Sequence, residues 1–309
     1  MKLKVKKCII LLINTKYRYK GDGNLGFFTP AENASNFINV GLKKTTEKPV
    51  KIFLLAIMAG AFIAITGSGV GVATHAISNA SLSKLIGGLI FPCGLTMVIL
   101  AGSELFTGNM LISVSCLEKK SKWSGMIKNL IIVYIGNFVG SILVVWILSI
   151  GKQWDLSSGL LGAMTIKTAV AKVSLPFLSV VMLGIMCNFL ICIAVWIASA
   201  AKDVAGKVIG LFLPVAFMIF CGFEHCIANM YFIPAGIFAL NNPEYVNKAI
   251  KLGVNVDKLS WGTFITNNLI PATIGNIIGG FCIGLVYWAV YLKKNKTIIE
   301  DKKSEKETA

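Results

Sequence analysis

Residues 221–230 read Cys-Gly-Phe-Glu-His-Cys-Ile-Ala-Asn-Met, CGFEHCIANM, inside an apolar region that covers about 205–240. A helix of roughly 20 residues crosses the hydrocarbon of a bilayer. This region is longer than that, yet too short for two ordinary spans, and Glu224 and His225 interrupt it. We therefore predict a helix that breaks near the middle of the membrane. Irregular backbone at that depth must be buried in protein or line a cavity.

The rest of the chain has the composition of a membrane protein. It has 309 residues, of which 55% are hydrophobic and only 14% are charged, whereas soluble domains are about a quarter charged. Alternating short strands are absent, which argues against a β-barrel. Apolar regions recur along the whole length and predict an all-α polytopic protein with six transmembrane helices. They cover about 51–76, 84–117, 126–150, 176–200, 205–240 and 262–292.

The basic residues indicate how the chain lies in the membrane. With six spans, 23 of the 30 Lys and Arg residues fall on the side that carries both termini, and seven fall on the other. Cytoplasmic loops carry the excess of basic residues, so both termini are expected in the cytoplasm of a cell-membrane protein. Residues 1–28 are expected to be a disordered cytoplasmic extension or to precede the true start, and 293–309 to be a Lys-rich cytoplasmic tail. The basic residues follow membrane topology, so the formal charge of +16 does not indicate nucleic-acid binding.

The second apolar region contains a segment that matches the first one quoted. Residues 102–110, GSELFTGNM, align without gaps on 222–230 at an offset of 120. Residues 53–60 match 177–184 at an offset of 124, and 136–140 match 275–279 at 139. Three matches in order predict two repeats of a three-helix unit, at about 45–150 and 170–292, with the second and fifth helices broken. An odd number of spans per repeat makes the repeats inverted, and the binding path of such proteins lies at the repeat interface.

Two carboxylates occupy equivalent places in the two segments. Glu104 and Glu224 are the only acidic residues within the apolar regions, and a buried carboxylate is costly unless it is paired or hydrogen-bonded. One interpretation is structural: each Glu, with Asn109 or Asn229 nearby, supports its helix break, the Glu accepting freed backbone N–H groups. The other interpretation is a relay for protons or ions.

His225 has no counterpart, because Leu105 occupies the matching place. An imidazole can exchange a proton near neutral pH or hydrogen-bond a small anion. Thr107 supplies a hydroxyl from the other break. The N-termini of the two second halves favour an anion, so we expect His225 and Thr107 to meet at a central anion path.

Further polar residues fall beside the breaks. Asn188 and Asn276 lie on spans that should face the repeat interface, where they either line the path or bridge helices. Lys172 precedes the fourth span and is either an ordinary interfacial lysine or a charge that attracts anions to the pore. A zinc site at Cys221, Glu224, His225 and Cys226 would lack a second ligand cluster, so no metal or other cofactor is expected. The eight Cys residues are expected to be small buried hydrophobes.

The motifs resemble those of the formate/nitrite transporter family over about residues 29–292. They are Ala-Gly-Ser-Glu-Leu-Phe-Thr-Gly at 101–108, Gly-Phe-Glu-His-Cys-Ile-Ala-Asn-Met at 222–230, Ala-Lys-Val at 171–173 and Asn-Leu-Ile-Pro-Ala-Thr-Ile-Gly-Asn-Ile-Ile-Gly-Gly at 268–280. The resemblance implies an aquaporin-like protomer, a homopentamer with one pore per protomer, and passage of small monovalent anions as a channel or with protons. It implies a transporter rather than an enzyme.

The resemblance also implies roles for single residues. Thr107 would belong to a loop that opens or closes the pore, and His225 would be the central imidazole, near Thr107 and Asn188. Asn276 would face the lumen, and Lys172 would be the vestibule lysine. The apolar constrictions would contain Phe91, Leu95, Leu105, Phe106 and Met218. Met218 departs from the Phe that formate channels often place there.

The expected substrate is formate, because residues 211–292 are most similar to formate members. The loop at 101–108 is more similar to nitrite members, so nitrite and hydrosulfide are kept as alternatives with the same mechanism. A neutral-solute channel and a membrane metalloenzyme are the rivals from other classes.

Overall fold

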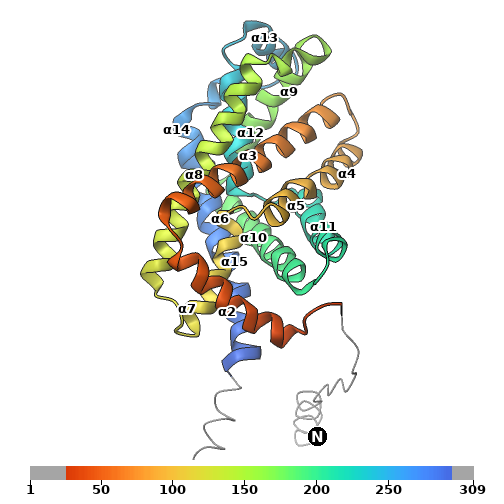
Figure 1. Ribbon diagram of the computed structural model, residues 1–309. Helices are drawn as coiled ribbons and strands as arrows, with labels where there is room; N and C mark the ends of the chain where they lie inside the picture. Colours follow the sequence, from red (N-terminus) through yellow and green to blue (C-terminus); the bar gives the residue numbers. More distant parts are fainter. Residues whose placement is uncertain (1–25, 294–309) are drawn as a thin grey trace, which may run out of the picture.

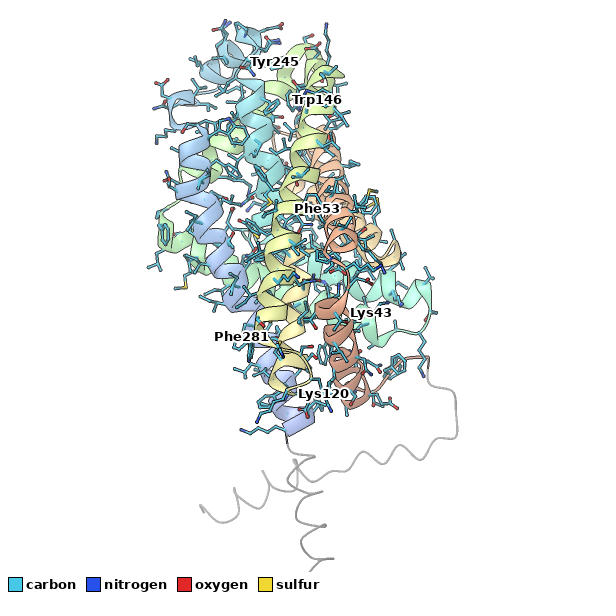
Figure 2. The ribbon with its side chains drawn as sticks, turned by 60° about the vertical axis from the view of Figure 1, so that its left-hand side comes forward. Lys43, Phe53, Lys120, Trp146, Tyr245 and Phe281 are labelled. Carbon is cyan, nitrogen blue, oxygen red and sulfur yellow. The ribbon has the colours of Figure 1, made fainter. Side chains whose placement is uncertain are left out.

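The computed structural model describes residues 26–293. The expectations for the first 25 residues and for the tail from 294 onwards fall outside the described residues. The molecule is elongated, with helix α13 (Pro243–Lys251) at one end and α2 (Pro30–Thr46) near the other (Figure 1). In Figure 2, Tyr245 and Trp146 mark the α13 end, and Lys43 and Lys120 mark the α2 end.

Helices form where the apolar regions predicted them, which confirms an all-helical membrane architecture. Five helices are long and apolar enough to cross a membrane within the described part of the chain. They are α3 (Pro49–Thr74), α4 with α5 (Ala80–Ile90 and Pro92–Leu100), α8 (Trp123–Ile150), α10 (Phe177–Ala200) and the continuous α14, η4, α15 and η5 (Trp261–Thr263, Phe264–Leu269, Ile270–Trp288 and Ala289–Lys293). The fifth apolar region forms two shorter helices instead, α11 (Val204–Phe220) and α12 (Cys226–Ala239).

Both expected breaks are present, and they have the same geometry. The chain turns at Gly102, with φ +75°, and at Gly222, with φ +69°, a conformation that glycine adopts without strain. After the first turn, Ser103 N donates to Val98 O at 2.8 Å; after the second, Phe223 N donates to Met218 O at 3.0 Å. The first break leads into α6 (Phe106–Asn109), η1 (Met110–Ile112) and α7 (Ser113–Leu117), and the second leads into α12.

Glycines bring the spans of each repeat into close contact. A β-carbon on Gly140 of α8 would lie 2.0 Å from Ile57 O of α3. A β-carbon on Gly279 of α15 would lie 2.1 Å from Ile185 O of α10. Any larger residue at Gly140 or Gly279 would force the helices apart, so these small residues set the packing of α3 on α8 and of α10 on α15.

The contacts of α3 and α10 repeat at an offset of 128 residues rather than at the 124 of the sequence match. Glu104 N donates to Leu55 O, and Glu224 N donates to Leu183 O. The shift of four residues is about one helical turn, so both alignments place the same face of α3 and α10 toward their partners. A sequence match between two apolar helices therefore fixes the face but not the turn.

A helix outside the predicted spans extends the repeat. Helix α9 (Leu156–Val173) precedes α10 as α2 precedes α3, and Lys172 near the end of α9 corresponds to Lys44 near the end of α2 at the same offset of 128. Thr29 and Glu32 form a capping box at the start of α2, whereas α9 begins through Ser157 and Ser158 with φ of +55° each.

A polar contact holds the α13 end together. Short 3₁₀ turns, η2 (Gln153–Asp155) and η3 (Val256–Lys258), flank α9 and α13 there. The Tyr245 hydroxyl of α13 donates to Asp155. Burial, with the nearby Asp155 carboxylate, raises the pKa of Tyr245 to about 12, so the phenol keeps its proton and the hydrogen bond at neutral pH.

Candidate functional site

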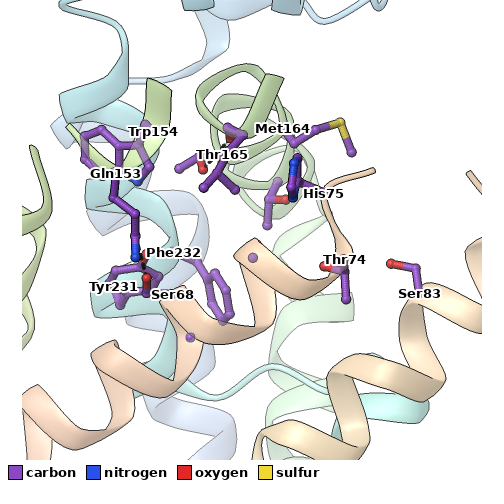
Figure 3. Close-up of a pocket in the computed structure, with 14 residues that line it drawn as sticks. Ser68, Thr74, His75, Ser83, Gln153, Trp154, Met164, Thr165, Tyr231 and Phe232 are labelled. Carbon is purple, nitrogen blue, oxygen red and sulfur yellow. Dashed lines mark hydrogen bonds between the residues drawn. The ribbon is translucent and has the colours of Figure 1, made fainter. Parts of the chain in front are cut away.

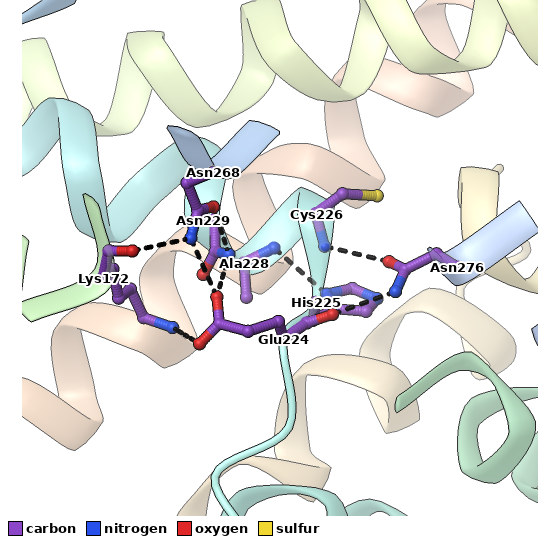
Figure 4. A network of polar contacts seen from close by, with 8 residues as sticks. All are labelled: Lys172, Glu224, His225, Cys226, Ala228, Asn229, Asn268 and Asn276. Atoms are coloured by element: carbon purple, nitrogen blue, oxygen red, sulfur yellow. Dashed lines mark hydrogen bonds and ion pairs between the residues drawn. The ribbon is translucent and has the colours of Figure 1, made fainter. Parts of the chain in front are cut away.

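Glu224 lies at the second break, surrounded by donors from three elements (Figure 4). Lys172 Nζ of α9 donates to Oε1 at 2.9 Å. Asn229 Nδ2 of α12 and Asn268 Nδ2 of η4 donate to Oε2 at 2.6 and 3.0 Å. The Glu224 side chain is only 4% exposed, so this carboxylate satisfies the rule that a buried charge must be paired and hydrogen-bonded.

The donors around Glu224 also bind one another. Asn229 Nδ2 donates to Asn268 Oδ1 at 2.6 Å, and Asn268 Nδ2 donates to the Lys172 carbonyl at 3.2 Å. The ends of α9, α12 and η4 are thereby joined through one carboxylate. We call Lys172, Glu224, Asn229 and Asn268 the Glu224 cluster.

Glu104 at the first break has a closely similar arrangement, formed by Lys44, Asn109 and Asn129. Lys44 Nζ of α2 lies 2.7 Å from both carboxylate oxygens. Asn109 Nδ2 donates to Glu104 Oε2 at 2.6 Å and to Asn129 Oδ1 at 2.8 Å. Asn129 Nδ2 donates to the Lys44 carbonyl at 3.1 Å. We call Lys44, Glu104, Asn109 and Asn129 the Glu104 cluster.

Two asparagines, rather than the two glutamates, accept the N–H groups at the helix starts after the breaks. Phe106 N donates to Asn137 Oδ1 at 3.0 Å, and Cys226 N donates to Asn276 Oδ1 at 2.9 Å. This differs from the expectation that each Glu side chain accepts freed backbone N–H groups. The carboxylates instead collect side-chain donors, so each break is held by a Glu and an Asn on different helices.

Asn276 uses its whole amide for this purpose. Its Nδ2 donates to Gly184 O at 2.8 Å and to Glu224 O at 2.9 Å, in addition to the bond that its Oδ1 accepts. Asn137 Nδ2 donates in the same way to Ala56 O at 2.8 Å and Glu104 O at 2.9 Å. Both amide hydrogens of Asn276 are engaged, so the structure gives this residue a role in holding the second break.

His225 and Thr107 meet where the two breaks converge. His225 Nε2 lies 3.0 Å from Thr107 Oγ1, and the two residues are 2% and 0% exposed. The Ala228 N–H at the start of α12 donates to His225 Nδ1 at 3.0 Å. Since Nδ1 must accept that bond, the neutral ring carries its hydrogen on Nε2 and donates it to the Thr107 hydroxyl. The cap on α12 thus assigns the tautomer of the imidazole.

Asn188 holds the loop that carries Thr107. Its Nδ2 donates to Asn276 O at 2.6 Å and to Thr107 O at 3.3 Å. The Cys192 thiol, one turn along α10, also donates to Thr107 O, at 3.4 Å. His225, Thr107 and Asn188 are therefore brought together as the sequence suggested, and Cys192 is an addition that composition alone did not distinguish from an ordinary core cysteine.

Buried apolar side chains belong to one cluster around these polar groups. The residues expected at the constrictions are between 0% and 4% exposed: Phe91, Leu95, Leu105, Phe106 and Met218. Leu95 and Leu105 line a pocket on the α2 side. Phe106 packs edge to face on Tyr134, with ring centroids 4.9 Å apart.

A pocket lies on each side of this centre. The α2-side pocket, of about 330 Å³, borders Lys44 and Glu104. The α13-side pocket, of about 120 Å³, lies between α3, α9 and α12. Repeat-equivalent positions line the two pockets. At an offset of 128, Val195 corresponds to Gly67 and Val40 to Thr168; at 120, Ile112 corresponds to Phe232. The pockets are thus the same feature of the fold at its two ends.

Several residues of this site were not predicted from the sequence. Lys44, Asn129, Asn137 and Asn268 were not expected to take part. Lys44 corresponds to Lys172 only at the structural offset of 128; the sequence match at 124 pairs Lys44 with Thr168 instead. Asn137 lies within the 136–140 match and corresponds there to Asn276, so the sequence match already contained a signal for its role.

The chain matches a known family over nearly all of its described length. The family model described as formate/nitrite transporter matches residues 31–289. The formate channel FocA of Escherichia coli strain K12 is 37% identical over 89% of this chain and 99% of its own length. A probable formate transporter of Methanothermobacter thermautotrophicus is 33% identical over 87% of this chain and 98% of its own. A solved pentameric formate channel with formate bound is 38% identical, with a TM-score of 0.70, covering 79% of this chain and 98% of that one.

Proposed function

This chain belongs to the formate/nitrite transporter family, is a multi-pass membrane protein that transports anions, and we propose that its substrate is formate. The observation that carries the proposal is the contact between His225 and Thr107. It places a buried N–H donor and a hydroxyl from opposite repeats at one point. Buried apolar residues surround that point, and a pocket lies on either side of it.

The charges of the site favour passage of formate as formic acid. Among the described residues at the centre, His225, Thr107 and Asn188 are polar but carry no formal charge in the arrangement described above. An ion without a partner is costly among buried apolar side chains, whereas a neutral acid is far less so. The proton that neutralises formate is taken up in one pocket and released in the other.

In this proposal His225 acts as a hydrogen-bond donor. The Ala228 N–H occupies its Nδ1 atom, so a second ring proton would have to displace the cap of α12. Water in the pockets then supplies the proton, and the Nε2–H of His225 and the hydroxyl of Thr107 guide the acid through the centre. The alternative that His225 itself transfers the proton requires that the Ala228 bond open during each passage.

Lys44 and Lys172 serve as the two positions that attract the anion. Each is paired with a glutamate, and their side chains are 24% and 19% exposed. Lys44 lines the α2-side pocket, whereas Lys172 Nζ lies 5.7 Å from the ring centroid of Phe232, which lines the α13-side pocket. An approaching anion competes with the carboxylate for these donors. Position and charge thus raise the local formate concentration at both ends.

Assembly and orientation complete the proposal. The pentameric relative supports a homopentamer with one path per protomer. A wholly apolar groove of about 750 Å³ between α8 and α15, lined by Leu130, Ile131 and Ile274 among others, is a surface that a neighbouring protomer would cover. The Lys and Arg distribution supports an orientation with the α2 end in the cytoplasm.

Uptake into proteoliposomes tests the substrate. We expect labelled formate to enter faster than nitrite or hydrosulfide, with a rate that increases as the external pH falls, because the acid form becomes more abundant. The variant Thr107→Val removes the hydroxyl while keeping a side chain of similar volume, and it should take up formate more slowly than the unmodified protein. If nitrite entered faster than formate, the proposed substrate would be wrong. Osmotic water flux without anion uptake would favour a neutral-solute channel.

A further inference from the structure

The α13-side pocket contains hydrogen-bond donors that the path described above does not use. Gln153, Trp154, Ser68 and Tyr231 gather on one side of this pocket (Figure 3). Ser68 Oγ donates to Gln153 Oε1 at 2.6 Å, so the amide oxygen is engaged and the remaining capacity of Gln153 is that of an N–H donor.

Trp154 is the unexplained member of this group. The residue is 3% exposed, and its buried Nε1 has no hydrogen-bond partner within the usual distance and angle limits in the described part of the chain. The neighbouring Tyr231 hydroxyl interacts with the indole as a weak hydrogen-bond partner, but not in the geometry of a full hydrogen bond. Since an indole nitrogen can only donate, a buried Nε1–H that is only weakly bound favours a ligand or a bound water as its acceptor.

The equivalent pocket at the other end lacks these donors. Val40 stands where the α13 side has Thr168, and Leu111 stands where it has Tyr231. The structural repeat that makes both pockets therefore does not account for these particular donors. The α2-side pocket has a different polar lining, which includes Lys44, Glu104 and Lys207.

The pocket adjoins the Glu224 cluster. Phe232 lines it, and Lys172 Nζ lies 5.7 Å from the centroid of that ring. Thr168, another lining residue, precedes Lys172 by one turn of α9. A ligand leaving the pocket toward the centre would therefore meet the Lys172 ammonium next.

We propose that the α13-side pocket is a binding subsite for a small carboxylate, held by the indole N–H of Trp154 and the amide N–H₂ of Gln153. No Asp or Glu lines the pocket, and the free amide of Gln153 and the indole of Trp154 can only donate, which favours a ligand with two acceptor oxygens over a cation. The volume of about 120 Å³ suits a molecule of formate size with accompanying water. The inference rests on the proposed function, since the carboxylate is its substrate waiting at one end.

If the subsite exists, variants in it should change the half-saturating formate concentration for transport that starts at the α13 side but not for transport that starts at the α2 side. In vesicles sorted by orientation, Trp154→Phe should raise the half-saturating formate concentration at the α13 side at least roughly tenfold, the effect of losing one hydrogen bond to a charged group. The value at the α2 side should stay unchanged. Gln153→Glu retains the acceptor for Ser68 but adds a negative charge, so its shift should be larger. Trp146→Phe is the matched control on the exposed face of α8 and should change neither value.

Two results separate this inference from the proposed function. Half-saturating concentrations for Trp154→Phe and Gln153→Glu equal to those of the unmodified protein would overturn the subsite alone, as would equal shifts from both ends. An unmodified protein that carries no formate would overturn the proposed function, and the subsite with it. Saturation transfer to the formate proton, measured on detergent-solubilised protein, should fall in both variants and stay constant in Trp146→Phe.

Discussion

The two helix breaks share one set of supports but differ at the point where they meet. At each break a Lys, a Glu and two Asn residues form the same cluster, and a third Asn binds the freed backbone N–H. At the centre the repeats diverge. His225 of the second repeat corresponds to Leu105 of the first, and Thr107 of the first repeat corresponds to Ile227 of the second. Asn188 matches Gly60 at the structural offset of 128.

This difference separates what the fold needs from what transport needs. A break in a membrane helix leaves polar backbone groups that must be satisfied, so each repeat keeps its full cluster. The two repeats share one path, so a hydrogen-bond donor for the substrate is needed in only one of them. For this reason the positions equivalent to His225, Thr107 and Asn188 in the other repeat are not polar. Residues that repeat therefore support structure, although Lys44 and Lys172 also attract the anion at the two ends. At the centre, the residues that do not repeat are the ones we assign to the substrate.

The largest expected effect comes from removing either asparagine that holds a break. Asn276→Leu and Asn137→Leu each remove three hydrogen bonds and leave a buried backbone N–H unsatisfied. We expect the free energy of unfolding to fall by about 3 kcal/mol in each, as measured by denaturant unfolding in detergent. Asn241→Leu, at an exposed site, is the control. A large loss in one variant only would show that the breaks are not equivalent.

Removing the lysines should have a smaller and unequal effect. Lys172→Gln leaves a Glu224 side chain that is 4% exposed, and Lys44→Gln leaves a Glu104 side chain that is 12% exposed. Because the more buried carboxylate is harder to leave unpaired, we expect losses of about 2 and about 1 kcal/mol. The same unfolding measurement gives both. The reverse order would mean that burial does not set the energy of these ion pairs.

Replacing His225 tests the unequal centre by making it match the first repeat. His225→Leu removes the donor to Thr107, and we expect formate flux to fall roughly tenfold, the equivalent of about 1.4 kcal/mol in the barrier. His225→Gln can still accept from Ala228 and donate to Thr107, so it should keep most of the flux. Equal flux in the two variants would count against the donor role.

The smallest expected effect comes from removing the capping box at the start of α2, a feature that the start of α9 lacks. Hydrogen bonds from the Thr29 backbone and hydroxyl lower the pKa of Glu32 below its usual value of 4.5. The stabilisation of α2 by the ionised Glu32 carboxylate is therefore fully present above pH 4.5 and is lost as the pH falls through the lower, folded-state pKa. Glu32→Gln should speed hydrogen exchange in the first turn of α2 at pH 7 but much less at pH 3. An equal effect at both values would exclude the carboxylate as the cause.

Sequence alone predicted the parts of this structure that depend on hydropathy and local pattern. The break at 221–225 follows from an apolar region of the wrong length, and the pairing of Glu104 with Glu224 follows from an ungapped match. The partners of those glutamates did not follow. Lys44 lies on a helix that is too polar to count as a span, and Asn129 and Asn268 look like ordinary interfacial residues until the fold brings them to a carboxylate.

The repeat register shows a second limit. The match of Phe53 to Phe177 gave 124, whereas the hydrogen bonds of Glu104 and Glu224 give 128. Two helices as apolar as these match almost equally well when shifted by one turn, because the packed face is the same. Only a polar contact with a defined partner atom, such as Asn276 to Gly184 O, distinguishes the two registers.

The central claim is that a neutral His225 donates from Nε2 to Thr107, and ¹⁵N NMR of the ring tests it most directly. The chain has two His residues, so His75→Gln leaves His225 as the single labelled imidazole. At pH 7.5 we predict a protonated Nε2 and an unprotonated, hydrogen-bonded Nδ1. A ring protonated on Nδ1, or on both nitrogens, would contradict the account.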